Sequence, residues 1–232
     1  MFRMNPVSII YQNDEILLIN KPYGVSVQGG NGVAHPLDKE LSKQVGYKVH
    51  LVHRLDRETS GLLVVAKSPQ AASKWINLIG SGKAHKEYTA ICFGVPVISG
   101  KEKISGTISA PVSQNGRTLN AVTHFTVKKS VDVCEPENPD NKLFKLSLVN
   151  LVLGTGRMHQ IRIHLGQCQC PIAADDRHGN FMVNKLAQKI CKIKKLCLVS
   201  SKIVIPLDGK DTVFEVRLPD HMQKVVDQYF GN

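Results

Sequence analysis

The chain is organised around residues 53–66, which read HRLDRETSGLLVVA. An apolar run precedes this stretch and the apolar run LLVVA ends it, so the segment between them is predicted to be a bend that joins two buried strands. The bend places one carboxylate, Asp56, between Arg54 and Arg57. Because nearby positive charge favours an ionised carboxylate, Asp56 is a candidate nucleophile or base. The alternative is a structural ion pair at a turn.

Composition limits the class of protein and the kind of partner. The chain has 232 residues, of which 42% are hydrophobic and 21% charged, which is ordinary for a globular protein. We expect a single domain over residues 1–232. The net charge of +11 favours a polyanionic partner, with nucleic acid first and an anionic membrane surface second. No segment has the roughly 20 apolar residues of a membrane span, and the N-terminus does not resemble a signal peptide, so we expect a cytoplasmic protein.

The six cysteines are scattered along the chain. In a reducing compartment they are expected to be free thiols rather than a disulfide set. Cys168 and Cys170 are separated by one residue, which is not a zinc-ligand spacing, and no second pair matches them. We therefore predict that the protein binds no metal.

Hydrophobic periodicity predicts more strands than helices, without regular alternation between them. This pattern favours an α+β class with a mixed, largely antiparallel central β-sheet flanked by helices and loops. Residues 94–121 are predicted to form short strands with turns, and residues 132–141 an exposed loop. The other predicted elements are a β-hairpin at 7–20, helices at 37–47, 69–79, 157–165 and 219–230, and strands at 83–92, 122–127, 143–153, 196–206 and 214–218.

A second polar stretch covers residues 155–164, which read TGRMHQIRIH. If it is helical, Arg157 and Arg162 point to different faces and have different roles. One interpretation is a solvated basic helix; the other is that one arginine pairs with Asp56 while the other polar groups meet phosphates or base edges. Tyr88, on a predicted strand, either packs or offers a ring for base stacking and a phenol for proton exchange.

Taken together, four motifs resemble the pseudouridine synthases, and in particular the RluA-type family. They occur in the expected order within a region from about residue 8 to residue 203. The motifs are Lys21-Pro22-x-Gly24, His53-Arg54-Leu55-Asp56-x-x-Thr59-Ser60-Gly61, Lys86-x-Tyr88 and Thr155-Gly156-Arg157-x-His159-Gln160-Ile161-Arg162-x-His164.

The resemblance implies the pseudouridine synthase fold and the isomerisation of uridine in RNA to pseudouridine, without cofactor or metal. It places the catalytic group at Asp56, a stacking and proton-exchanging ring at Tyr88, and the charge partner of the aspartate at Arg162. Arg54 matches the residue that fills the gap left by the flipped nucleotide. The remaining candidates for RNA binding are His53, Thr59, Arg157, His159, Gln160 and Lys195.

The chemistry implied by the family agrees with these residue types. Breaking the bond between N1 and C1′ is a glycosidic cleavage, and a carboxylate can attack C1′, attack C6 or abstract a ribose proton. These three routes remain open. The base has to leave its stack, which costs a few kcal/mol and is cheaper in RNA loops. The expected partner is a stem-loop of ribosomal RNA or tRNA, and the protein is expected to be a monomer.

The chain departs from the family pattern at several positions, which concern the loop shape and the RNA fit. Ala174-Asp175 stands where Gly-Asp is usual, His178-Gly179 where Tyr-Gly is usual, Leu198-Val199-Ser200 where Leu-His-Ala is usual, and Met158 where Thr or Ser is common. The chain has no room for an N-terminal S4 domain, so the lysine-rich segment 185–202 is a candidate RNA contact. Two other functions remain open: a non-catalytic RNA-binding protein, and a glycosidase-like hydrolase that would need a second acid.

Overall fold

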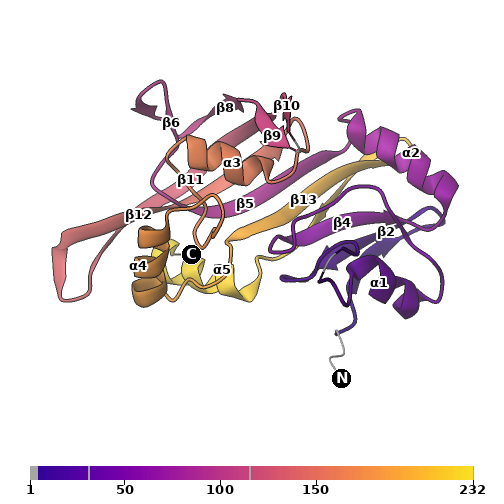
Figure 1. The fold of residues 1–232 in the computed structure, drawn as a ribbon, viewed down its shortest axis with the longest axis horizontal. Helices are drawn as coiled ribbons and strands as arrows, with labels where there is room; N and C mark the ends of the chain where they lie inside the picture. The colour runs from indigo at the N-terminus through magenta and orange to yellow at the C-terminus, as the bar shows by residue number, and fades with distance from the viewer. Residues whose placement is uncertain (1–4, 31, 115, 232) are drawn as a thin grey trace. The chain divides into compact units, whose positions relative to one another are not determined.

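The structure, a computed structural model, describes residues 5–30, 32–114 and 116–231. The chain divides into two compact units. Unit 1 consists of Met1–Lys86 and Val199–Arg217, and unit 2 consists of Glu87–Leu198 and Leu218–Asn232. Each unit contains strands and helices of its own (Figure 1). The expectation of a single domain stays a prediction.

The strands of unit 1 surround β4, the strand that follows the Asp56 bend. β4 pairs antiparallel with β2 and β3, and parallel with β13. The order β1-β2-β4-β13 is extended by β14, which pairs antiparallel with β13. The bounds are β1 Ser8–Gln12, β2 Ile16–Lys21, β3 His50–Leu51, β4 Ser60–Ala66, β13 Leu198–Leu207 and β14 Lys210–Glu215. All seven residues of β4 are buried, as its continuous apolar pattern predicts.

Two helices accompany these strands, α1 (Leu37–Val45) and α2 (Pro69–Gly80). Ser68 caps α2 by accepting a hydrogen bond from the amide of Ala71, and a proline follows at the first helical position, as the sequence predicts. The apolar face of α2 joins the strands in one core, in which Trp75 is 2% exposed. The Trp75 indole donates a hydrogen bond to Glu15 over 2.9 Å. The base of the Asp56 loop is therefore part of a well-packed layer.

Gly61 lies where β4 meets β13, beside Ser200. Its φ is 106°, and a Cβ on this residue would lie 2.2 Å from the carbonyl oxygen of Ser200. Only glycine combines this backbone conformation with so close an approach. We expect Gly61→Ala to lower the free energy of unfolding by roughly 2–3 kcal/mol, because backbone strain and overpacking act together.

Urea unfolding followed by the fluorescence of Trp75, the single tryptophan, measures this effect. The matched control is Gly80→Ala at the end of α2, where an added Cβ has no described atom within 4 Å. Gly80→Ala should leave the stability unchanged or slightly raise it. Equal unfolding midpoints for the two variants would contradict the predicted role of Gly61.

Unit 2 contains four antiparallel strands in the order β5-β12-β11-β8. Their bounds are β5 His85–Phe93, β8 Ser105–Ser109, β11 Val122–Glu135 and β12 Asn138–Leu153. In the sequence between β5 and β11, the chain forms two short two-stranded ribbons, as predicted for this region. They are β6 (Val97–Ile98) with β7 (Lys101–Glu102), and β9 (Val112–Gln114) with β10 (Arg117–Leu119). Asn115, between β9 and β10, lies outside the described residues.

The prediction of a loop at 132–141 is wrong, because β11 and β12 continue through these residues as one hairpin (Figure 1). Only Pro136 and Glu137 form the turn. Pro136 suits a turn because its φ is fixed, and Pro139 lies beside a bulge near Cys134, where a missing N–H is tolerated. Asp132 pairs with Lys142 across the ladder over 2.7 Å. The prolines and acids that suggested a loop are thus features of a hairpin tip.

The helices of unit 2 are α3 (Gln160–Gln167), α4 (Phe181–Cys191) and α5 (Asp220–Val225), and a π-helical turn, Val226–Phe230, follows α5. Strands outnumber helices in both units and most ladders are antiparallel, so the predicted α+β class is confirmed. The six cysteines, all within the described residues, are free thiols. Among the described helices, none combines the length and the apolar character needed to span a membrane.

Candidate active site

Asp56 lies in a loop of unit 1 between β3 and β4, and it is half-buried. The amide of Thr59 donates to the carbonyl oxygen of Asp56 over 3.1 Å, which closes the turn. The next residue, Arg57, binds a second loop twice. Its carbonyl accepts from the amide of Gly24 over 2.9 Å, and its Nε donates to the carbonyl of Gly24 over 3.2 Å. The backbone that follows Asp56 is therefore fixed by its own turn and by the loop that contains Gly24.

The side chain of Lys21, the last residue of β2, is fully buried. Its Nζ donates to three backbone carbonyls, those of Pro22 over 3.0 Å, Val25 over 2.7 Å and Arg57 over 3.1 Å. Burial lowers the pKa of Lys21 to about 7, while the negative charges of Glu58 and Asp56 oppose the shift. Lys21 therefore fixes the Asp56 loop and adds a buried amine whose charge interacts with the Asp56 carboxylate.

The lowered pKa of Lys21 predicts a pH dependence of stability. Between pH 7 and 8.5 the folded protein releases a proton that the unfolded chain keeps, because the ordinary pKa of lysine is 10.5. Stability contributed by a group with a lowered pKa increases with pH in this window. We expect the free energy of unfolding of the natural protein to rise by about 1.5 kcal/mol relative to Lys21→Met from pH 7 to 8.5.

Urea unfolding of both proteins at the two pH values measures this difference. Lys48→Met, at an exposed lysine of the same unit, is the control and should follow the natural protein. If Lys21→Met shows the same pH dependence as the natural protein, the lowered pKa of Lys21 is wrong.

The other predicted residues of this loop differ in their surroundings. His53 accepts a hydrogen bond at Nε2 from the amide of Val64 over 3.0 Å, and burial, assisted by the charge of Lys86, lowers the pKa of His53 to about 3. Its ring is therefore neutral and supports β4. Arg54 is exposed. Thr59 is 2% exposed, and its Oγ1 has no hydrogen-bond partner within the described part of the chain. A buried hydroxyl of this kind is satisfied by water or by a ligand.

In unit 2, helix α3 begins at Gln160 rather than at Arg157, which corrects the predicted start. The buried Gln160 side chain holds the preceding turn to β11. Its Oε1 accepts from the hydroxyl of Thr155 over 2.6 Å and from the amide of Arg157 over 3.1 Å, and its Nε2 donates to Val122 and Thr123. Arg157 itself is exposed, and its Nε donates to the carbonyl of Asn120 over 3.3 Å. Because Arg157 precedes α3, the prediction that Arg157 and Arg162 point to different faces of one helix does not apply.

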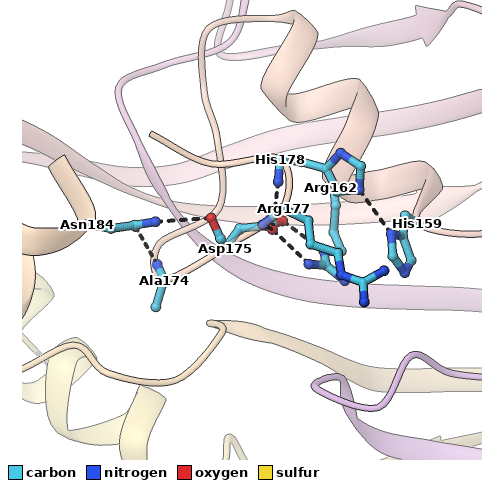
Figure 2. Close-up of polar contacts among 7 residues, drawn as sticks. All are labelled: His159, Arg162, Ala174, Asp175, Arg177, His178 and Asn184. Carbon is cyan, nitrogen blue, oxygen red and sulfur yellow. Dashed lines mark hydrogen bonds and ion pairs between the residues drawn. The ribbon is translucent and has the colours of Figure 1, made fainter. Parts of the chain in front are cut away.

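Arg162 and Asp175 form a buried, two-pronged ion pair (Figure 2). The Nε of Arg162 donates to Oδ2 of Asp175 over 2.8 Å, and Nη2 donates to Oδ1 over 2.7 Å. Burial by itself would raise the pKa of Asp175, but the hydrogen bond from Arg162, the amide of His178, the charge of Arg162 and the amide of Arg177 outweigh it and lower that pKa. The predicted pairing of Arg162 with Asp56 stays a prediction.

The Asp175 loop is held from several sides, as Figure 2 shows. Oδ1 of Asp175 also accepts from the amides of Arg177 and His178, each over 3.0 Å. Asn184, on α4, accepts from the amide of Ala174 and donates to the carbonyl of Asp175. His178 is joined to His159 by a ring-to-ring hydrogen bond of 2.9 Å. Arg162 therefore sits against a rigid loop and not against solvent.

Two further predicted residues lie elsewhere in unit 2. Tyr88 is 5% exposed on β5 and pairs with Leu151 of β12 in the ladder. Lys195 is exposed in the segment after α4. Within the described residues, no group of three or more His, Cys, Asp or Glu side chains gathers as a metal site would require.

Comparison with known proteins decides the family. A family model described as RNA pseudouridylate synthase matches residues 15–167, which is more than half of the chain. The chain belongs to this family. It is accordingly an RNA pseudouridine synthase, which is an isomerase.

Curated relatives of the synthase are similar over most of its length. "Ribosomal large subunit pseudouridine synthase C" of Rickettsia felis is 35% identical over 224 residues, which cover 91% of this chain and 67% of the relative. The protein of the same name from Rickettsia bellii is 32% identical over 227 residues, which cover 94% and 70%.

Two solved human structures share the fold. "Human RNA Pseudouridylate Synthase Domain Containing 4" has a TM-score of 0.73 at 23% identity and covers 95% of this chain and 92% of that one. "Human RNA Pseudouridylate Synthase Domain Containing 1" has a TM-score of 0.70 at 21% identity, with coverage of 94% and 86%. The predicted pseudouridine synthase fold is confirmed.

The predicted site residues of the synthase divide between the two units. Asp56, His53, Arg54 and Thr59 belong to unit 1, whereas Tyr88, Arg157, His159, Gln160, Arg162 and Lys195 belong to unit 2. Within unit 1 the structure adds Lys21, the first residue of the Lys21-Pro22-x-Gly24 motif. Within unit 2 it adds Asp175. The sequence signal for Lys21 is its place at the end of the strand ILLINK, two residues after the apolar run ILLI.

The family departures near Asp175 have local consequences in the synthase. Ala174 has a φ of 58°, in the region that favours glycine, and its amide is held by Asn184. His178, which stands where tyrosine is usual in the family, contacts His159. His159 also has a positive φ, of 53°, at the start of α3. Both departures are accommodated inside the loop that holds Arg162.

Proposed function

We propose that this synthase isomerises specific uridines of large-subunit ribosomal RNA to pseudouridine, with Asp56 as the catalytic group. The choice of RNA is supported by the relatives, which are named ribosomal large subunit pseudouridine synthases. The choice of residue is supported mainly by one observation. The fully buried Lys21 uses all three N–H donors of its ammonium group on backbone carbonyls at the Asp56 loop and the loop beside it. That arrangement presents the Asp56 carboxylate on a rigid support.

The reaction is an intramolecular transfer whose product has the same atomic composition as uridine. The bond between N1 and C1′ breaks, the uracil turns while it stays bound, and a bond forms between C5 and C1′. The proton on C5 leaves and N1 ends with a proton. The Asp56 carboxylate starts this sequence by attack on C1′, by attack on C6 or by removal of a ribose proton. Water has to be excluded, because hydrolysis would release free uracil.

The remaining residues receive roles that support Asp56. Tyr88 stacks on the flipped base and exchanges a proton, and Arg162 pairs with the Asp56 carboxylate. Arg54, which is exposed, enters the gap that the flipped uridine leaves. The buried hydroxyl of Thr59 is a donor for the bound nucleotide. His53, Arg157, His159, Gln160 and Lys195 complete the proposed RNA contacts, with His53 and Gln160 acting through the backbone that they hold.

Pseudouridine mapping tests the proposal. RNA from cells with and without the protein is treated with a carbodiimide that marks pseudouridine, and reverse-transcription stops are mapped on ribosomal RNA and tRNA. We expect defined stops in large-subunit ribosomal RNA to disappear without the protein. They should return with the natural gene and not with Asp56→Asn.

Each other outcome contradicts one part of the proposal. Stops that are lost only from tRNA would overturn the choice of RNA but keep the reaction. Full restoration by Asp56→Asn would overturn the catalytic role of Asp56. Activity of the purified protein should also survive a metal chelator. Light scattering should show the mass of a monomer, and urea unfolding should show one transition, as expected of one domain. Loss of activity with chelator would contradict catalysis without metal.

A further inference from the structure

Helix α4 presents a continuous solvent face that combines two apolar side chains with basic ones. The exposed residues recur at intervals of three and four, so they form one stripe along the helix. We call this stripe the α4 face; it consists of Phe181, Met182, Lys185, Gln188, Lys189 and Lys192.

The two apolar residues of the α4 face are adjacent in the sequence and open to solvent. Phe181 is 76% exposed and Met182 71% exposed. Side chains of this size are normally covered, and two adjacent ones at the end of a stripe indicate a binding surface more than a chance pair. Their exposure therefore needs a physical reason other than the packing of unit 2.

The helix that carries these side chains is firmly anchored. The side chain of Asn180 accepts hydrogen bonds from the amides of Met182 and Val183, which caps the first turn. The opposite face is buried at Ala187 and Cys191, and the thiol of Cys191 is hydrogen-bonded to Tyr229 near the C-terminus. Asn184 ties the same helix to the Asp175 loop. Phe181 and Met182 are thus held outward by an ordered helix.

The charged side chains of the α4 face are all basic. From Arg177 to Leu207 the chain has six lysines and no acid. On the α4 face, Lys185 and Lys189 are one turn apart, about 6 Å along the axis, and Lys185 follows Phe181 by the same interval. An aromatic ring followed by a row of cations matches single-stranded nucleic acid, because the ring can stack on a base and the cations can bind the phosphate backbone.

We propose that the α4 face binds an unpaired segment of the RNA substrate, with a base stacked on Phe181 against Met182 and phosphates bound by Lys185 and Lys189. The inference rests on the proposed function for its RNA. An unpaired strand fits better than duplex, because a paired base has no free face to stack. It also fits better than a protein partner, since two apolar side chains are far less than the roughly 1,000 Å² of a stable interface.

Binding of a labelled RNA to the full-length protein tests the proposal. The probe is a fluorescein-labelled 12-nucleotide oligouridine, compared with a duplex of the same length, and the readout is anisotropy at several salt concentrations. Phe181→Ala should weaken binding to the single strand about five- to tenfold and leave the salt dependence unchanged. Phe181→Trp should bind as the natural protein does, because it keeps an aromatic face.

The lysines have a different signature. The double variant Lys185→Gln with Lys189→Gln should make the fall of log K, the binding constant, with log salt less steep by about 1.4. Each phosphate contact with a single strand contributes about 0.7 to this slope. The matched controls are Ile104→Ser, at a side chain that is 74% exposed, and Lys101→Gln with Lys210→Gln at exposed lysines elsewhere. Controls should bind as the natural protein does. Thermal unfolding of each variant checks that the fold is retained.

The outcomes separate this inference from the proposed function. If the natural protein binds the oligouridine and the α4 variants bind it equally well, the inference fails and the proposed function stands. If the natural protein modifies no RNA in the mapping experiment, the proposed function fails whatever the oligouridine result. Loss of binding to vesicles of anionic phospholipid on Phe181→Ala, with RNA affinity unchanged, would assign the α4 face to a membrane and overturn the inference.

Discussion

Asp56→Asn is expected to lower the rate of pseudouridine formation by the purified synthase about 10³-fold or more. Asparagine keeps the shape of the side chain but carries no charge, so it can neither attack carbon nor accept a proton at pH 7. The loop should keep its conformation, because the contacts that fix it use the backbone of Asp56 and Arg57. The loss should therefore appear in kcat, while the affinity for RNA changes little.

Tritium release measures this rate directly. RNA labelled at C5 of uridine loses its label when C5 forms the bond to C1′, and the substrate is the ribosomal RNA segment identified by mapping. Asp14→Asn is the matched control, since Asp14 is exposed in the turn between β1 and β2 and should retain full activity. An Asp56→Asn protein that releases tritium at the natural rate would remove Asp56 from the mechanism.

Asp175→Ala is expected to lower the free energy of unfolding by about 3–5 kcal/mol, the usual cost of removing one partner of a buried ion pair. The change deletes both hydrogen bonds to Arg162, whose side chain is 4% exposed, and the acceptor for the amides of Arg177 and His178. Because the pKa of Asp175 lies below its ordinary 3.8, this stabilisation is complete above about pH 4 and is lost as the pH falls through the lowered value.

Urea unfolding at pH 7 tests the role of Asp175 against two comparisons. Asp132→Asn breaks the exposed pair with Lys142 and should cost at most about 1 kcal/mol. The double variant Asp175→Ala with Arg162→Met should recover part of the loss, because it removes the buried charge as well. Equal stability of Asp175→Ala and Asp132→Asn would show that the Arg162 pair contributes nothing beyond a surface contact.

The sequence predicted local elements well wherever the signal was local. The cap at Ser68 and the apolar run of β4 depend on neighbouring residues, and both predictions are confirmed. The loop predicted at 132–141 was wrong because Pro136, Pro139 and the acids have the composition of a loop, whereas the β11–β12 ladder is decided by pairing between strands. Such pairing overrides composition.

The site was predictable only in part, for a related reason. The motifs identified Asp56 and Arg162 as important, but the supports of each come from distant segments. Lys21 reaches the carbonyl of Arg57 from another strand, and Asp175 reaches Arg162 from a loop beyond α3. Gln160, whose contact with RNA stays a prediction, fastens the turn before α3 to β11 with its side chain. Spacing along the chain cannot reveal which polar group faces which carbonyl.

The parallel pairing of β4 with β13 has a consequence for the order in which the synthase is made. Ser60 pairs with Val199, and the closest approach, at Gly61, is to Ser200, so the neighbour of β4 on this side comes from the far end of the chain. On the ribosome, β2 and β4 can pair early, because both leave the exit tunnel before β13 does. A nascent chain that stops before residue 199 would already contain Asp56, Tyr88 and Arg162 and still lack the strand that closes over the base of the Asp56 loop. The last 34 residues of the 232-residue chain are therefore needed before β4 has its neighbour on this side.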